Sequence, residues 1–177
     1  MRKTSALGFT LMEVMTVIAI IAVIVGIAIP NYSIFTSNGR LAGASEELMN
    51  SLSLAKSEAV KRGRMVTVCN SANPAADTPT CTPAGNEDWR TGWIVYFDNG
   101  KAPAYSGDDA NILRTTQALG SMDSATASGV TSITFRSTIS QGTSPVTIRF
   151  CTKGATERQV IVDRLGSISR NQGNTCN

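Results

Sequence analysis

The residue types that carry most enzyme chemistry are sparse in this sequence. Its 177 residues include no histidine, and the four cysteines stand at positions 69, 81, 151 and 176. The lack of histidine excludes Ser-His-Asp and Cys-His nucleophiles, histidine proton relays and nearly every zinc site. The cysteine spacings match no metal motif and no Cys-x-x-Cys pair. We therefore expect no catalytic residue, no metal and no cofactor, and a protein that is not an enzyme.

The most distinctive chemistry lies near the N-terminus, at the start of a long apolar run. A short basic leader ends at Gly8, Phe9-Thr-Leu-Met-Glu13 follows, and the run continues to Ile29. A carboxylate inside a membrane helix costs on the order of 2–3 kcal/mol and requires a partner or a role. An amine released by cleavage before Phe9, on a neighbouring subunit, is one partner for Glu13. The other interpretation is a carboxylate that reaches the lipid headgroups.

The apolar run is long enough to cross a membrane. From Leu11 to Ile29 it would form roughly 28 Å of helix, close to the thickness of a bilayer core. No Ala-x-Ala cleavage site follows it, as it would in a secretory signal, so we expect the helix to remain on the protein. Arg2 and Lys3 place its N-terminal end in the cytoplasm by the positive-inside rule.

A helical apolar period continues beyond Pro30. The apolar positions on this period are Leu41, Leu48, Leu52, Ala55 and Ala59. They predict one long helix over residues 10–62, of roughly 80 Å, with Gly63 as its C-cap. Gly26 and Pro30 are the expected places for a kink.

From residue 65 the pattern changes to short β-rich runs bounded by turn residues. The runs are 65–69, 92–98, 112–117, 132–135, 146–151, 158–162 and 167–170. Trp93, Val95 and Phe97 alternate along one run, so we expect them in the core. One helix followed by short strands predicts an α+β fold with an antiparallel sheet on the apolar stripe of the helix. Residues 70–88 are rich in proline and predict a long surface loop, and 98–100 and 165–166 predict hairpin turns.

All four cysteines follow the membrane segment and lie on its non-cytoplasmic side. An even number of cysteines in an oxidising compartment indicates disulfides, and four cysteines allow three pairings. We favour Cys69–Cys81, which would close the proline-rich loop, and Cys151–Cys176, which would hold the C-terminal tail to a strand. Each disulfide would contribute about 3 kcal/mol by restricting the unfolded chain.

Net charge gives little global attraction to nucleic acid or anionic lipid. The formal charge is +3, and without Arg2 and Lys3 the chain has 14 basic and 13 acidic residues. The C-terminal part is more basic, and its candidate phosphate contacts are Lys153, Arg158, Arg164 and Arg170. A solvated face is the commoner explanation of such a stretch.

The N-terminal motif resembles the signal of a known family. Gly8-Phe9-Thr10-Leu11-Met12-Glu13, with Pro30 at the matching distance, is similar to the class III leader of type IV pilins and type II secretion pseudopilins. The resemblance implies cleavage after Gly8 by a prepilin peptidase, N-methylation of Phe9, and pairing of Glu13 with the Phe9 amine of an adjacent subunit to set the register of assembly. It divides the chain into a leader (1–8), a transmembrane and filament-core helix (9–30), an amphipathic half-helix (31–63) and a periplasmic β-rich domain (64–177).

A second motif narrows the resemblance. Trp89-Arg-Thr-Gly-Trp-Ile-Val-Tyr-Phe-Asp98 resembles the GspH/FimT/FimU group of minor pilins and pseudopilins. The resemblance implies a pilin-like fold. Within the group the chain is most similar to a FimU-type minor pilin, which implies a subunit that helps to initiate or cap a type IV pilus. Its implied partners are other minor and major pilins, the prepilin peptidase and the inner-membrane assembly platform. The implied location is the inner membrane, by a single span, and then the pilus at the cell surface.

Two alternatives stay open. FimT-like pilins that bind DNA for natural transformation carry a Gly-Arg-x-Arg type motif near the C-terminus, and this chain has Gly166-Ser-Ile-Ser-Arg170 there. The first arginine is missing, so DNA is a possible partner but not the favoured one. The other alternative is the H-type pseudopilin of a type II secretion system, whose membrane helix would be the same.

Overall fold

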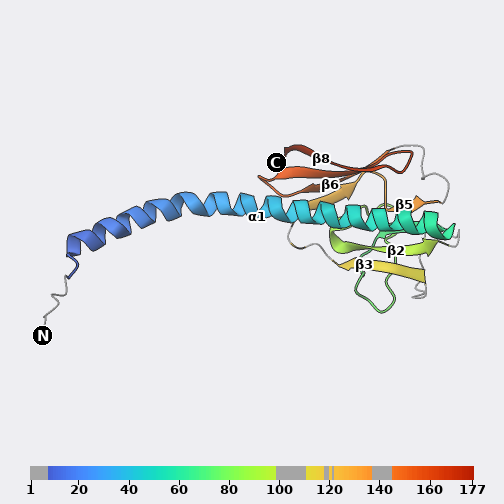
Figure 1. Ribbon diagram of the computed structural model, residues 1–177, viewed down its shortest axis with the longest axis horizontal. Helices are drawn as coiled ribbons and strands as arrows, with labels where there is room; N and C mark the ends of the chain where they lie inside the picture. The colour runs from blue at the N-terminus through green and yellow to red at the C-terminus, as the bar shows by residue number, and fades with distance from the viewer. Residues whose placement is uncertain (1–7, 99–110, 118–119, 121, 137–144) are drawn as a thin grey trace, which may run out of the picture. The chain divides into compact units, whose positions relative to one another are not determined.

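The computed structural model describes residues 8–98, 111–117, 120, 122–136 and 145–177, and only the backbone of residues 28–31. The chain forms two compact units, Met1–Thr36 and Ser37–Asn177, and each is described by itself. Helix α1 (Leu11–Arg62) contributes to both units (Figure 1). The long helix expected over residues 10–62 is therefore confirmed, and its backbone stays helical through Pro30. The kink expected at Gly26 and Pro30 stays a prediction.

In the first unit, α1 exposes its apolar side chains on all sides. Every described side chain from Gly8 to Ile27 is exposed, including Val14, Ile18 and Val25. Such a surface requires lipid or other protein around it, because a water-exposed helix normally has a polar face.

In the second unit, the described strands form two four-stranded antiparallel sheets. Sheet A has the order β3 (Ile112–Gln117), β2 (Gly92–Asp98), β1 (Met65–Asn70) and β5 (Ser132–Phe135). Sheet B has the order β4 (Ser124–Ala127), β6 (Val146–Cys151), β7 (Thr156–Val162) and β8 (Ile168–Thr175). We expected one sheet, but β4, β6, β7 and β8 form a second one because none of them pairs with a strand of sheet A in the described chain.

The sequence prediction missed one strand and shortened others, β8 most of all. β4 has the sequence Ser-Ala-Thr-Ala and offers no large apolar residue, so its alternation is weak. β8 was expected only over residues 167–170 but continues to Thr175. Its side chains are mostly exposed and polar, because it is an edge strand of sheet B whose pairing with β7 depends on the backbone.

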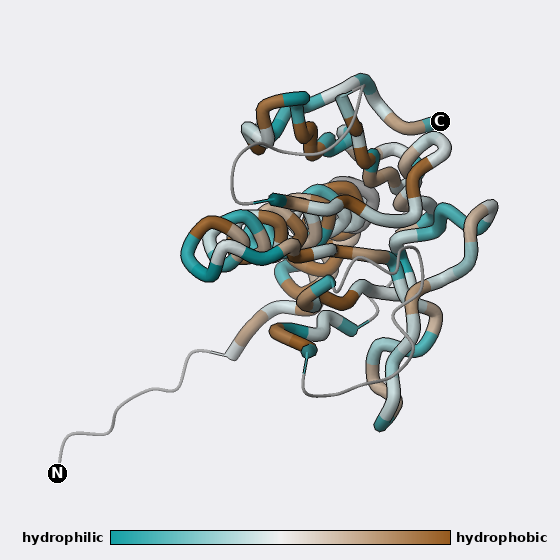
Figure 2. Tube along the Cα trace, turned by 90° about the vertical axis from the view of Figure 1, so that its right-hand side faces the viewer, coloured by the Kyte–Doolittle hydropathy of each residue, from teal (hydrophilic) through white to brown (hydrophobic). Residues whose placement is uncertain are grey.

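The main core lies between α1 and both sheets, as the view along the helix shows (Figure 2). The predicted stripe of Leu41, Leu48, Leu52, Ala55 and Ala59 is fully buried. Sheet A adds Val68 and the predicted Trp93, Val95 and Phe97, and sheet B adds Ile148, Phe150 and Val160. Each buried Leu, Ile or Phe side chain contributes about 1.5–3 kcal/mol.

A second, smaller core lies on the outer face of sheet A. It consists of Cys69, Ile94 and Tyr96, with Cys81 and Ile112 packed against them. Strands β1 and β2 are therefore buried on both faces, which explains why β2 is apolar along its whole length rather than at alternate positions.

Two glycines hold backbone conformations that other residues would strain. Gly63 follows the last residue of α1 with φ of +63°, so the predicted C-cap is present. Gly92 begins β2 with φ of +115°, and a Cβ there would collide with the Thr116 carbonyl oxygen and the Pro74 ring. This position in the Trp-Arg-Thr-Gly-Trp motif therefore needs glycine for packing as well as for its backbone.

Candidate functional site

The start of α1 is organised around Thr10 and Glu13. The Thr10 hydroxyl accepts a hydrogen bond from the Glu13 backbone N–H at 3.3 Å, and the Thr10 carbonyl accepts from the N–H groups of Glu13 (3.1 Å) and Val14 (3.3 Å). This is the N-cap geometry of a Thr-x-x-Glu pattern, and a carboxylate in the first turn is favoured by the helix dipole. Glu13 therefore has a role within its own helix, which sequence analysis missed although the spacing was visible.

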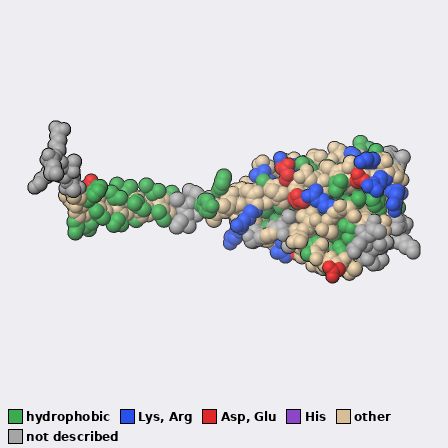
Figure 3. Space-filling model, turned by 60° about the horizontal axis from the view of Figure 1, so that its bottom comes forward, with side chains coloured by type: hydrophobic (Ala, Val, Ile, Leu, Met, Phe, Trp, Pro, Cys, Tyr) green, Lys and Arg blue, Asp and Glu red, His purple; other side chains and the backbone are tan. Residues whose placement is uncertain are grey.

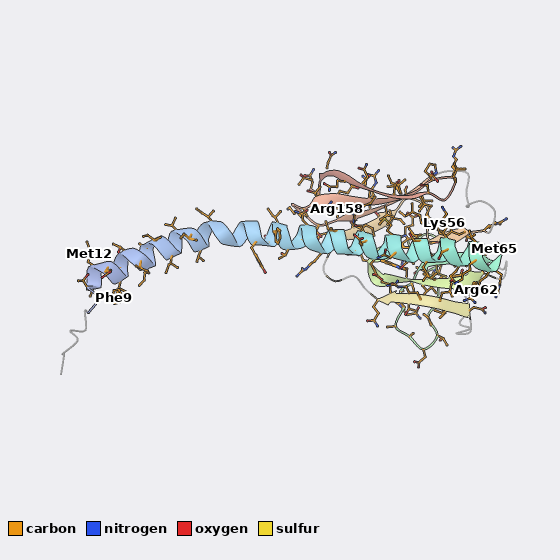
Figure 4. The ribbon with its side chains drawn as sticks, in the orientation of Figure 1. Phe9, Met12, Lys56, Arg62, Met65 and Arg158 are labelled. Carbon is orange, nitrogen blue, oxygen red and sulfur yellow. A yellow bond between two sulfur atoms is a disulfide. The ribbon has the colours of Figure 1, made fainter. Side chains whose placement is uncertain are left out.

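Phe9 and Glu13 lie on the same side of the helix, four residues apart. With Val14, Val17 and Ile18 they line a hollow of about 250 Å³. Phe9 is 81% exposed and projects from the end of the helix (Figure 4). Within the described residues, no cation lies within 4 Å of the Glu13 carboxylate. The carboxylate is thus open to a positive group from outside the chain.

By length and composition, α1 is a helix that can cross a membrane. None of its most apolar window is buried within the chain, so this segment is not the core helix of the β-rich unit. The exposed apolar surface and the carboxylate near its start form one candidate site.

Two disulfides join loop and tail segments to strands within the β-rich unit. Cys69–Cys81 joins the end of β1 to the proline-rich loop, and Cys151–Cys176 joins the end of β6 to the C-terminal tail, which are the two pairings favoured above. The tail is also held by backbone hydrogen bonds of 2.9 Å, from Cys176 N–H to the Ala155 carbonyl and from Gly154 N–H to the Cys176 carbonyl.

The proline-rich loop of residues 71–87, without helix or strand as expected, is fixed at both ends. The Asn70 side-chain amide donates to the carbonyls of Asn86 (2.8 Å) and Asp88 (3.1 Å). The Arg90 guanidinium beside Asp88 holds the pKa of that carboxyl below its ordinary value. Arg90 also donates to the Asp123 carbonyl at 3.0 Å and so links the short helix η1 (Trp89–Thr91) to the segment before β4.

Polar contacts fix α1 to both sheets. The Trp93 indole N–H donates to the Ser51 hydroxyl at 2.9 Å in a fully buried site. Glu47 pairs with Arg114 of β3, and Glu46 pairs with Arg170 of β8, each at 2.6 Å. These contacts join residues more than forty positions apart, so the local sequence contains no signal for them.

The structure does not bring the four candidate phosphate contacts together. Lys153 lies in the β6–β7 turn and Arg164 in the β7–β8 turn, at opposite ends of β7 and so roughly 20 Å apart. Arg158 and Arg170 share the face of sheet B that carries the buried Val160, since Arg170 pairs with Val160 and Arg158 is two residues before it. Arg170 is also engaged by Glu46. A DNA role for these residues stays a prediction.

The match that identifies the family lies within the second unit of the chain. A family model described as type II transport protein GspH matches residues 44–166, more than half of the chain. The chain belongs to this family. No curated protein sequence matches it significantly.

Solved structures of a minor pilin have the same fold. Two crystal structures of the type IV minor pilin FimU of Pseudomonas aeruginosa PAO1, in space groups P21 and P65, match with TM-scores of 0.58 and 0.55. They are 23% and 22% identical to the chain and cover 81% and 77% of it, and 99% of each FimU chain is matched.

The pilin-like α+β fold expected from the sequence is therefore confirmed. The chain's relatives are structural pilin subunits and not enzymes. Membership of this family, with an apolar N-terminal helix, indicates a membrane-anchored subunit that assembles with other pilins. In the part of the chain that the structure describes, no group of three His, Cys, Asp or Glu side chains could hold a metal ion.

Proposed function

We propose that this GspH-family chain is a minor pilin of a type IV pilus, which helps to initiate or cap the filament. The observation that carries the proposal is the contrast within α1. Its first unit exposes every described apolar side chain, whereas the second unit buries a stripe under its own two sheets. A folded domain attached to an uncovered apolar helix fits a subunit whose helix packs against lipid first and against other subunits afterwards.

The proposed pathway begins in the inner membrane, with the N-terminus in the cytoplasm and the β-rich unit in the periplasm. The prepilin peptidase cleaves after Gly8 and methylates Phe9, and the assembly platform then moves the helix into the filament. There the Glu13 carboxylate meets the Phe9 amine of an adjacent minor or major pilin. Helix packing supplies most of the association, and the ion pair selects the register.

The fold of FimU supports the pilus, whereas the family model supports a second candidate, the H-type pseudopilin of a type II secretion system. Deleting the gene separates the two. A type IV minor pilin would be required for surface pili but not for secreted enzymes, and a pseudopilin would show the reverse. Normal pili and normal secretion in the deletion strain would contradict both, and restoration by the wild-type gene is the control.

DNA capture, as in FimT-like pilins, is a weaker candidate because the four candidate cations are spread over sheet B and Arg170 is paired. Titration of the full-length chain in detergent with labelled duplex DNA at two salt concentrations tests it. Micromolar binding that weakens steeply with salt would support DNA contacts, since phosphate binding releases counterions. Absence of binding at low salt would exclude the DNA role.

A further inference from the structure

A groove runs beside the last turns of α1. It has a volume of about 660 Å³ and is lined from the helix by Lys56, Val60 and Lys61, from the β7–β8 turn by Ser167 and from β8 by Ile168. The β7–β8 turn is fixed against the helix because the Lys56 ammonium donates to the Gly166 carbonyl at 2.8 Å. This α1–β8 groove is therefore built by two elements held in contact.

One exposed apolar side chain lines the α1–β8 groove and another lies in the turn beside it. Val60 lines the groove and is 59% exposed, and Leu165, two residues before the groove residue Ser167, is 74% exposed. In the described part of residues 37–177 these are the only large hydrophobic side chains that are exposed. The domain buries its other described large apolar side chains wholly or partly. Two that are exposed close together in sequence and fold therefore indicate a contact surface.

Basic side chains also lie at this groove. Lys61, which lines it, has a side chain that is 76% exposed, and Arg164 in the β7–β8 turn is also exposed. Arg62 and Arg64 lie instead on the sheet A side of the helix end, since their guanidinium groups stand over the Phe97 ring of β2 at 4.9 and 4.7 Å. Lys and Arg side chains gather at this end of the domain (Figure 3), and Figure 4 shows Lys56 above the end of the helix and Arg62 below it, toward sheet A, with Arg158 farther from this end.

The neighbouring described carboxylates are already occupied. Glu58, whose side chain is 13% exposed, pairs with Arg62 at 2.6 Å and lies 3.7 Å from Lys61. Asp163 accepts the backbone N–H groups of Leu165 (2.9 Å) and Ser167 (2.7 Å) within the turn. The charge presented around the groove is therefore positive, and it complements an acidic partner.

We propose that the α1–β8 groove docks a different pilin subunit, through an apolar side chain of that subunit flanked by carboxylates. This inference rests on the proposed function as a filament subunit. The apolar pair favours a protein over a polyanion such as nucleic acid, since phosphates would leave Val60 and Leu165 uncovered. A different subunit is favoured over a second copy, because the described part of this chain's β-rich unit displays no other exposed large apolar residue, and the apolar stretch of its first unit carries Glu13 as its single acid.

Photo-crosslinking of the full-length chain in filament-forming cells tests the proposal. A photoreactive residue replaces Val60, and a matched control replaces the exposed Asn174 at the other end of β8. The expected product is an adduct from position 60, and not from 174, that mass spectrometry identifies as another pilin. Leu165→Asp should lower its yield roughly tenfold, because it replaces the exposed apolar side chain of the turn beside the groove by a carboxylate, which an acidic partner would repel. Lys61→Glu should lower it about fivefold, and Lys153→Glu, at the opposite end of β7, should not change it.

The remaining outcomes overturn the inference. These are an adduct with a second copy of the chain, an adduct with nucleic acid that nuclease removes, or equal yields from both positions. Absence of an adduct from a chain that is present in purified filaments would reject the groove and leave the proposed function standing. Absence of the chain from both pili and secretion filaments would reject the proposed function and the groove together.

Discussion

The two parts of α1 use the same helical backbone for opposite purposes. Up to Phe35 the helix exposes its described Val, Ile and Met residues on all sides, and from Leu41 onward it buries a single stripe and exposes Lys56, Lys61 and Arg62. The second part obtains its partners from the same chain, because the two sheets cover it. The first part has none in the described chain, so its partners must come from a membrane or from other subunits. One helix thus contains a folding surface and an assembly surface in sequence.

The largest expected effect comes from truncating the buried stripe. Leu48→Ala should lower the free energy of unfolding of the β-rich unit by about 2–5 kcal/mol, because it leaves a cavity between α1 and the sheets. Ile20→Ala, in the exposed part, should leave that free energy unchanged. Denaturant titration of the full-length chain in detergent, followed by tryptophan fluorescence, reports on this unit alone because both tryptophans lie in it. Equal losses in the two variants would contradict the division of the helix.

The next largest loss in the free energy of unfolding is expected from removing either disulfide. Replacing Cys151 and Cys176 by serine should cost about 3.5 kcal/mol, and replacing Cys69 and Cys81 should cost about 2.8 kcal/mol, since the first pair closes the longer loop. The same titration measures both losses, and a membrane-fraction assay should show that neither changes insertion of the helix. A loss of insertion in either variant would show that the two regions do not act independently.

A smaller effect is expected from Ser51→Ala. The change leaves the Trp93 indole N–H buried without its acceptor, which should cost about 1–3 kcal/mol. Ser57→Ala is the matched control, since the Ser57 hydroxyl is exposed and bonds only to the Leu54 carbonyl of its own helix. If both variants unfold at the same denaturant concentration, the Ser51–Trp93 contact does not stabilise the helix against sheet A.

The smallest effect concerns alkaline pH. Burial, and next the charge of Asp98, raise the pKa of Tyr96 to about 12, against an ordinary value of 10. The folded state keeps the phenol proton to a higher pH than the unfolded state does. The contribution of this proton to the free energy of unfolding is therefore complete below pH 10 and is lost as the pH rises toward 12. At pH 11 the wild type should have lost about 1 kcal/mol relative to Tyr96→Phe. Parallel stability profiles of the two proteins between pH 9 and pH 11 would contradict this.

Much of the fold could be predicted because its signals are local. The 3.6-residue stripe identified the helix to within a residue of its observed ends, and β-rich runs between turn residues identified all the described strands except β4. The division into two sheets could not be predicted, because it depends on which strands pair and not on any one segment. The second core on the outer face of sheet A was missed for a similar reason, since its cover comes from a loop that looks only polar and proline-rich.

The features of the candidate site also divide into those that the local sequence predicts and those that it does not. The leader motif and Glu13 are contiguous in sequence and were recognisable, whereas the contacts of Glu46, Glu47 and Ser51 with the sheets are long-range and were not. The basic C-terminal residues were grouped because they are close in sequence. In the structure, a strand separates Lys153 from Arg164, and the positive surface instead includes the end of α1. Nearness along the chain was misleading for these side chains because β7 runs between them.

Glu13→Gln in full-length protein, with incorporation into purified filaments as the measurement, tests the assembly role most directly. Glutamine has nearly the same shape as glutamate, and it keeps the capping pattern, in which Glu or Gln stands three residues after Thr10. The helix should therefore still form and the leader should still be cleaved. We expect cleaved Glu13→Gln protein to accumulate in the membrane while its amount in filaments falls severalfold. Incorporation at the wild-type level would contradict the proposal that the Glu13 charge sets the register of assembly.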